Sequence, residues 1–177
     1  MDKLSHPDKL HLDAAEGWLL LERPDYALEE FDRLSESCRG TPDVLERKWQ
    51  THAMAGNWTE AHATAEQLVR LHPKRPFGWV HRAYALRRMP GGSLEQAREA
   101  LLPAASRFPR DFLIPYNLAC YAARLNRGEE AWDWLQAAGR IAGNARIRRM
   151  ALADEDLVSL REQVLKMLPH KPGKSPG

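Results

Sequence analysis

Apolar side chains recur along this chain at steps of three and four residues, which places them on one face of an α-helix. Stretches with proline, glycine and other turn-forming residues separate these apolar patterns. We therefore expect helices over residues 7–22, 25–37, 43–55, 58–71, 76–89, 93–107, 112–126 and 128–141, with a shortened helix over 144–152 and an amphipathic one over 154–168. The pattern predicts an all-α protein.

The helical pattern itself repeats. Four alanines, each near the start of the second helix of a pair, are spaced by 34, 36 and 34 residues: Ala27, Ala61, Ala97 and Ala131. Apolar residues recur four and seven positions after each of them, at Phe31, Ala65, Leu101 and Leu135, and at Leu34, Leu68, Ala104 and Ala138. A small residue where two helices cross lets their backbones approach closely. The period predicts a stack of helix pairs, an architecture that generally works by binding.

These motifs resemble the tetratricopeptide repeat (TPR), whose signature is W-x2-L-G-x2-Y…A-x3-F…P over 34 residues. Ala27 and Phe31 match its middle element, and residues 116–131 form the most family-like copy. Trp49 departs from the pattern, because the family prefers a small residue there, and Ala53 and Ala55 are expected to make the close contact instead. The resemblance implies a right-handed superhelical solenoid of about four repeats with a C-terminal capping helix.

The repeat boundaries define the expected domain organisation. We expect a single domain over residues 1–168, with repeats at approximately 8–41, 42–75, 76–111 and 112–143, a capping region at 144–168 and a disordered tail at 169–177. No apolar run approaches the ~18 residues of a membrane span, and the first residues lack the apolar core of a signal peptide. Cys38 and Cys120 have no metal-type spacing, which indicates free thiols. We therefore expect a cytoplasmic protein.

Binding in the TPR family takes place on the concave wall, which the first helix of each repeat lines. The resemblance implies a partner-binding groove in which the second half combines aromatic rings with arginines: Phe77, Val80, His81, Tyr84, Arg87, Arg88, Tyr116, Asn117, Cys120 and Arg124. The rings among them would serve equally well in packing between repeats. The clamp with which some TPR proteins hold the acidic tail of a chaperone is absent, because Phe77 and His81 stand where its last Lys and Arg would be.

Charge is distributed unevenly along the chain. Residues 1–73 hold 8 Lys and Arg against 14 Asp and Glu, a net −6, whereas residues 74–150 hold 14 against 6, a net +8. A partner with acidic and apolar residues would be oriented by such a surface. The same asymmetry allows a homodimer in which the acidic residues 1–73 of one copy meet the basic residues 74–150 of the other.

Catalytic and metal-binding motifs are not recognisable. The sequence has no Ser-His-Asp order, glycine-rich phosphate loop or Cys-x-x-Cys pair. His62 and Glu66 lie one helical turn apart, but no third metal ligand accompanies them. We therefore expect no enzyme activity, no metal and no cofactor.

The leading hypothesis is a protein–protein interaction scaffold that binds a partner peptide in its concave groove, extended or helical. The alternatives are a cytosolic secretion-type chaperone, RNA binding by the basic second half, and self-association. Nucleic acid is disfavoured by the acidic first half and a pI of about 8.6.

Overall fold

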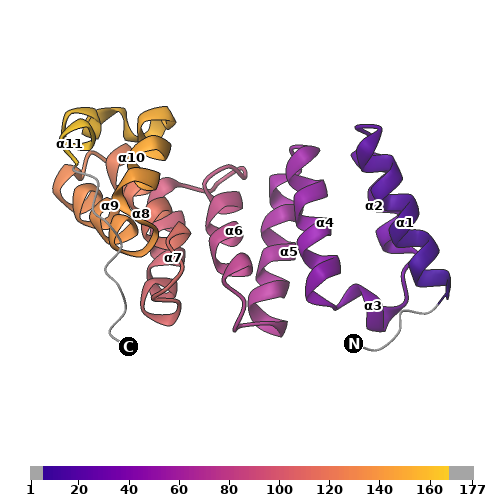
Figure 1. Cartoon of the computed structure of the whole chain (residues 1–177). Coiled ribbons are helices and arrows are strands. Elements are labelled where there is room, and N and C mark those ends of the chain that lie inside the picture. The colour runs from indigo at the N-terminus through magenta and orange to yellow at the C-terminus, as the bar shows by residue number, and fades with distance from the viewer. Residues whose placement is uncertain (1–5, 168–177) are drawn as a thin grey trace, which may run out of the picture. The chain divides into compact units, whose positions relative to one another are not determined.

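The computed structural model describes residues 6–167, and every regular element within them is a helix (Figure 1). The helices are α1 His6–Leu20, α2 Pro24–Asp32, α3 Glu36–Arg39, α4 Pro42–Met54, α5 Trp58–Leu71, α6 Pro76–Leu86, α7 Leu94–Arg107, α8 Leu113–Arg124, α9 Gly128–Ala142, α10 Asn144–Ala153, the 3-10 helix η1 Glu155–Leu160, and α11 Arg161–Lys166. The all-α prediction is confirmed. The tail expected at 169–177 lies outside the described residues.

Two compact units divide the chain, the first reaching Gly92 and the second beginning at Ser93. In the first unit α1 packs on α2, α4 on α5, and α5 on α6. In the second, α8 packs on α7 and α9, α9 on α10, and η1 on α8. The single domain expected from the sequence stays a prediction. None of the helices within residues 6–167 has the length and apolar character needed to cross a bilayer.

The core lies where the repeat pattern predicts it. Each of the four periodic alanines, Ala27, Ala61, Ala97 and Ala131, has 0% of its surface exposed. The positions four and seven residues after them are buried as well: Phe31, Ala65, Leu101 and Leu135, then Leu34, Leu68, Ala104 and Ala138. Methyl-sized side chains at the crossings let each helix pair approach closely, and the larger residues fill the layers between.

The helix expected over 25–37 is broken, which corrects that prediction. α2 ends at Asp32, and the short α3 begins at Glu36. The carboxylate of Asp8, only 5% exposed, accepts hydrogen bonds from the Ser35 backbone N–H at 2.7 Å and from its hydroxyl at 2.8 Å. Ser35 Oγ in turn accepts from the Cys38 N–H at the start of α3. These bonds replace helical ones, and therefore Ser35 begins a new helix instead of continuing α2.

The capping region is also divided where one helix was expected. A 3-10 turn, η1, precedes α11, because the Asp154 side chain caps the Asp156 N–H at 3.0 Å. Leu157, Leu160 and Val164 are nevertheless buried. The apolar face that the sequence predicted for this segment is therefore present, although the helix that carries it is interrupted.

Replacing Gly78 with alanine tests the close approach of α5 and α6. A Cβ at Gly78 would lie 2.9 Å from Leu68 Cβ and 3.1 Å from the Val69 backbone nitrogen. Gly78→Ala should therefore lower the free energy of unfolding by about 1–3 kcal/mol, measured by urea denaturation. Gly17→Ala is the matched control in α1, where nothing lies within 4 Å of the added methyl, and it should raise stability by about 0.5–1 kcal/mol. A gain in both variants would contradict this packing.

Candidate functional site

The ten residues predicted to bind a partner all lie in the described part of the chain, but they belong to different units. Phe77, Val80, His81 and Tyr84 are on α6, with Arg87 and Arg88 just after its end, in the first unit. Tyr116, Asn117, Cys120 and Arg124 are on α8, in the second unit. Each group has its own geometry, and the two are described separately.

In the first unit the rings of α6 gather around Trp49 of α4. The Trp49 side chain is 5% exposed, and its indole meets Phe77, His81 and Tyr84 edge-on, with centroids 5.8, 4.2 and 6.1 Å away. Phe77 and His81 stack on each other at 3.7 Å. Such edge and offset contacts stabilise by roughly 0.5–1.5 kcal/mol per pair beyond the apolar area they bury. Phe77 and Tyr84 therefore do pack between helices, yet both remain partly exposed.

Trp49 is the residue that departs from the TPR pattern, and the structure shows how it is accommodated. Its neighbours in the cluster include Ala61, Ala65 and Ala85, which are buried, and Ala53, which is partly buried. Ala53 thus lies at this contact, as the sequence predicted, whereas Ala55 is exposed after the end of α4. Small residues around the indole leave the space that it fills.

His81 is neutral in this environment. Its Nδ1 lies 2.9 Å from the Phe77 backbone oxygen, one turn earlier in α6. Burial lowers the pKa of His81 below the ordinary histidine value, and the bond to the carbonyl offsets this only in part. The imidazole therefore behaves as a flat, uncharged ring within the cluster near neutral pH.

Arg88 supplies the positive charge at this surface. Its guanidinium carbon lies 3.6 Å from the centroid of the Tyr84 ring and 5.4 Å from that of Trp58, the first residue of α5. The Arg88 Nη1 also donates to the Tyr84 backbone oxygen at 3.3 Å. We call the set formed by Trp58, Phe77, His81, Tyr84 and Arg88 the α6 surface. It combines half-buried rings with a cation held against two aromatic faces.

Trp58 was not among the predicted residues. The sequence reasoning took groove positions only from the first helix of each repeat, whereas Trp58 begins a second helix. Its ring lies 6.0 Å from that of Tyr84. The sequence feature that could have indicated Trp58 is its position directly after the turn between α4 and α5. In the structure this turn lies near the C-terminal end of α6, where Arg88 is found.

In the second unit Tyr116, Cys120 and Arg124 of α8 contact aspartates of the same chain, and of these three Tyr116 and Cys120 are buried whereas the Arg124 side chain is 55% exposed. The Tyr116 hydroxyl donates to Asp154 Oδ2 at 2.9 Å, and the Cys120 thiol lies 3.7 Å from the same oxygen. Arg124 Nε is 3.8 Å from Asp156 Oδ1. Burial, together with the neighbouring thiol and carboxylates, raises the pKa of Tyr116, and its hydroxyl therefore stays protonated as a donor. We call residues 154–157, Asp-Glu-Asp-Leu, the acidic segment.

The remaining predicted residues have local roles. The Asn117 amide donates to the Leu113 backbone oxygen at 2.8 Å. Val80 is buried within α6, and Arg87 is the C-cap residue of that helix.

The contacts around Cys120 also bear on metal binding. Ligand atoms of Cys120, Asp154 and Asp156 lie within 4.8 Å of one another. Their positions are already accounted for by the hydrogen bonds from Tyr116 and Cys120 and by the Arg124 guanidinium. His62 Nδ1 and Glu66 Oε2 lie 3.9 Å apart on α5. The absence of a metal stays a prediction from the sequence.

Several arginines of the basic second half hold helices together. Arg98 on α7 pairs with Glu130 on α9 at 2.6 Å, and Arg127 pairs with Glu95 on α7 at 2.8 Å. In the first unit Arg75 similarly bonds Asp43 and Glu46 of α4, at 3.1 and 2.8 Å. The charge excess predicted from the sequence is therefore partly neutralised by contacts between neighbouring helix pairs.

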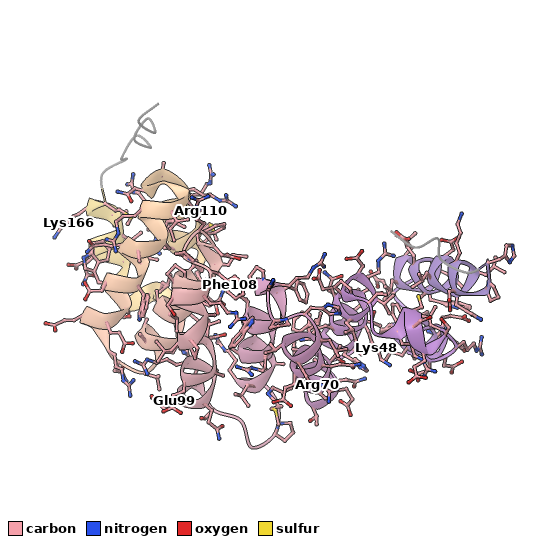
Figure 2. The ribbon with its side chains drawn as sticks, turned by 90° about the horizontal axis from the view of Figure 1, so that it is seen from below. Lys48, Arg70, Glu99, Phe108, Arg110 and Lys166 are labelled. Atoms are coloured by element: carbon pink, nitrogen blue, oxygen red, sulfur yellow. The ribbon has the colours of Figure 1, made fainter. Side chains whose placement is uncertain are left out.

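A pocket of about 650 Å³ lies in the first unit beside the break between α2 and α3. Phe31, Val44 and Leu45 supply buried apolar side chains, and Lys48 and Arg70, labelled in Figure 2, line it from α4 and α5. Lys48 is paired with Asp32 at 2.7 Å. None of the ten predicted residues lines this pocket.

The structure is that of a helical-repeat protein. Its helices form pairs that repeat along the chain, and small residues lie where the paired helices cross. Solved structures of TPR proteins share this fold. A thermophilic TPR protein of Thermus thermophilus, TTC0263, is 21% identical, with a TM-score of 0.64 over 90% of this chain and 91% of that one. MamA from Desulfovibrio magneticus RS-1 is 16% identical, with a TM-score of 0.67 over 93% of this chain and 96% of that one. Another MamA structure is 15% identical, with a TM-score of 0.68 over 91% of this chain and 87% of that one.

The chain therefore has the TPR fold, as its sequence motifs predicted. A comparison with protein-family models finds no match, and neither does one with curated proteins. At these identities the similar structures establish the fold alone.

Two histidines, the buried His52 and the half-buried His81, predict a pH dependence of stability. Burial lowers the pKa of both His81 and His52 in the folded state, so below pH about 6.5 the unfolded chain binds protons that the folded chain does not. The free energy of unfolding should fall with pH below this value, by up to about 1.4 kcal/mol per pH unit for each histidine. His81→Phe keeps a ring in the stack but cannot be protonated, and urea titrations from pH 7 to 5 should show a flatter slope. An unchanged slope would contradict this assignment.

Proposed function

We propose that this protein is a protein–protein interaction scaffold and that the α6 surface is the centre of its partner-binding site. The observation that carries the proposal is the placement of the Arg88 guanidinium over the Tyr84 ring, beside partly exposed Phe77 and His81. Rings offer apolar contact with little loss of conformational entropy, and a guanidinium offers two parallel hydrogen bonds to a carboxylate. A peptide with both acidic and apolar residues fits such a surface.

The TPR fold supports this role, because stacked helix pairs expose a continuous surface formed by successive first helices. Tyr116, Asn117, Cys120 and Arg124, which the sequence also predicted as groove residues, lie on α8 in the second unit. Of these, Tyr116, Cys120 and Arg124 contact the acidic segment in this structure. Cytoplasmic location, a homodimer and the lack of a cofactor stay predictions from the sequence.

Peptide binding is favoured over RNA binding by the partners of the arginines. RNA-binding surfaces need cations that are available to phosphates. Arg98 and Arg127, however, are engaged by Glu130 and Glu95 in the second unit. The rings of the α6 surface lie in the first unit, which includes the whole acidic part of the chain, residues 1–73.

Charge reversal at Arg88 tests the proposed site. Affinity capture from a native lysate with the wild type and Arg88→Glu should recover a protein partner at least about tenfold less with the variant, because a like charge replaces a charge-assisted bond. Arg70→Glu is the control, since it makes the same charge change on α5, away from the α6 surface. Helical circular dichroism should be the same for all three proteins. Equal partner recovery with Arg88→Glu and wild type, or recovery of nucleic acid alone, would contradict the proposal.

A further inference from the structure

The pocket beside the break between α2 and α3 is lined by residues of several helices of the first unit. On α5 the lining residues follow one another at helical spacing, so that one face of this helix is turned toward the pocket: Ala63, Thr64, Gln67, Arg70 and Leu71. The short α3 adds Arg39, and α4 adds Lys48. Its volume of about 650 Å³ is in the range of sites that bind small molecules.

Two of the cations that line this pocket have no acidic partner within residues 6–167. Arg39 and Arg70 are exposed, and neither forms an ion pair with a described carboxylate. Lys48, by contrast, is paired with Asp32 at 2.7 Å. Guanidinium groups bind carboxylates through parallel, charge-assisted hydrogen bonds. Two of them, from different helices, are therefore available to an anion in this pocket.

The charge of the lining limits how many negative charges the ligand carries. Among the described lining residues Glu36 is the one acid. Because Lys48 is engaged by Asp32 and Glu36 offsets one of the two remaining cations, the pocket has an excess of one positive charge. This favours a ligand with a single negative charge over a phosphate monoester, which carries about −1.5 to −2 near neutral pH.

The rest of the lining suits an apolar group. Leu71, at the end of α5, is 46% exposed, and Ala63, two turns earlier on the same face, is exposed as well. Phe31 and Leu45 form a buried wall behind them. A ligand that covers Leu71 and Ala63 removes apolar surface from water, which favours binding.

Hydrogen bonds hold the walls of the pocket in place. His72 Nε2 donates to the Gly40 backbone oxygen at 2.8 Å and thereby joins the residue after α3 to the residue after α5. The Asp8 carboxylate fixes the start of α3 through its two bonds to Ser35. The helices that carry Arg39 and Arg70 are thus connected before a ligand arrives, and a site formed in advance loses less entropy on binding.

We propose that this pocket binds a small monocarboxylic acid with an apolar body. Arg39 and Arg70 hold the carboxylate, and Leu71 and Ala63 contact the apolar body. The α6 surface contributes no residue to the lining. The inference therefore goes beyond the proposed function and does not depend on it: the scaffold has a second binding site, for a small molecule.

The experiment uses octanoate as the probe and the full chain in isothermal titration calorimetry. Octanoate should bind saturably to the wild type. Arg39→Gln and Arg70→Gln should each weaken binding about tenfold, because each removes a charge-assisted hydrogen bond. Arg110→Gln is the matched control and should leave the affinity unchanged, since Arg110 is an exposed arginine of the second unit (Figure 2). Helical circular dichroism should be the same for all four proteins.

Related probes test the two halves of the ligand separately. 1-Octanol keeps the apolar body without the charge, and acetate keeps the charge without the body. Each should bind at least about tenfold more weakly than octanoate. Octylamine, which carries the opposite charge, should bind no better than acetate. Equal binding of octanoate and 1-octanol would contradict the role given to the arginines.

Three further results would overturn the inference: no saturable binding of octanoate, unchanged binding in the Arg39→Gln/Arg70→Gln double variant, or tighter binding of the tripeptide Ala-Ala-Leu, as its free acid, than of octanoate. The last would mean that the pocket takes the C-terminus of a peptide instead of a small acid.

The capture of a protein partner and the binding of octanoate report on separate sites. Arg70→Glu should abolish octanoate binding and leave partner capture unchanged, whereas Arg88→Glu should do the reverse. If octanoate fails to bind while Arg88→Glu still loses the partner, the small-acid site is wrong and the proposed function stands. If Arg70→Glu loses the partner, the pocket holds a protein segment, and the small-acid ligand is overturned.

Discussion

The close approach of paired helices at methyl-sized side chains is the constraint on which the rest of this structure depends. Ala27, Ala61, Ala97 and Ala131 are fully buried, and Gly78 brings α6 close to the backbone of α5. Once these crossings are fixed, the residues that follow at helical spacing can only point into the layers between pairs. Positions on the remaining faces are then available to the aromatic and charged side chains of the α6 surface and to Tyr116, Cys120 and Arg124 of α8.

The repeat period was predictable because it depends on contacts within one helix pair. Ala131 and Leu135, for example, are four residues apart, and their burial follows from helical geometry. The break at Ser35 was not predictable, because the carboxylate that stabilises it belongs to Asp8, 27 residues earlier. The cover over α8 was missed for the same reason, since Tyr116 and Asp154 are 38 residues apart. Sequence spacing does not reveal which distant polar groups will meet.

The predicted binding residues illustrate how one helical position acquires different roles. Phe77, His81 and Tyr84 are held by the large indole of Trp49, which replaces the small residue of the TPR pattern. On α8, Tyr116 and Arg124 instead face the chain's own carboxylates, Asp154 and Asp156. The framework determined where these side chains lie, whereas the neighbours that they meet were set by residues outside the repeat signature.

The Asp154 side chain links two events that are usually separate. One of its oxygens shapes the 3-10 turn, and the other lies against Tyr116 and Cys120. Loss of the turn and exposure of α8 are therefore one opening step, whose free energy is that of a local unfolding. The buried Cys120 thiol lies under this cover, and burial slows the chemical modification of a thiol. The rate at which a thiol reagent modifies Cys120 is thus a measure of how often the second unit opens.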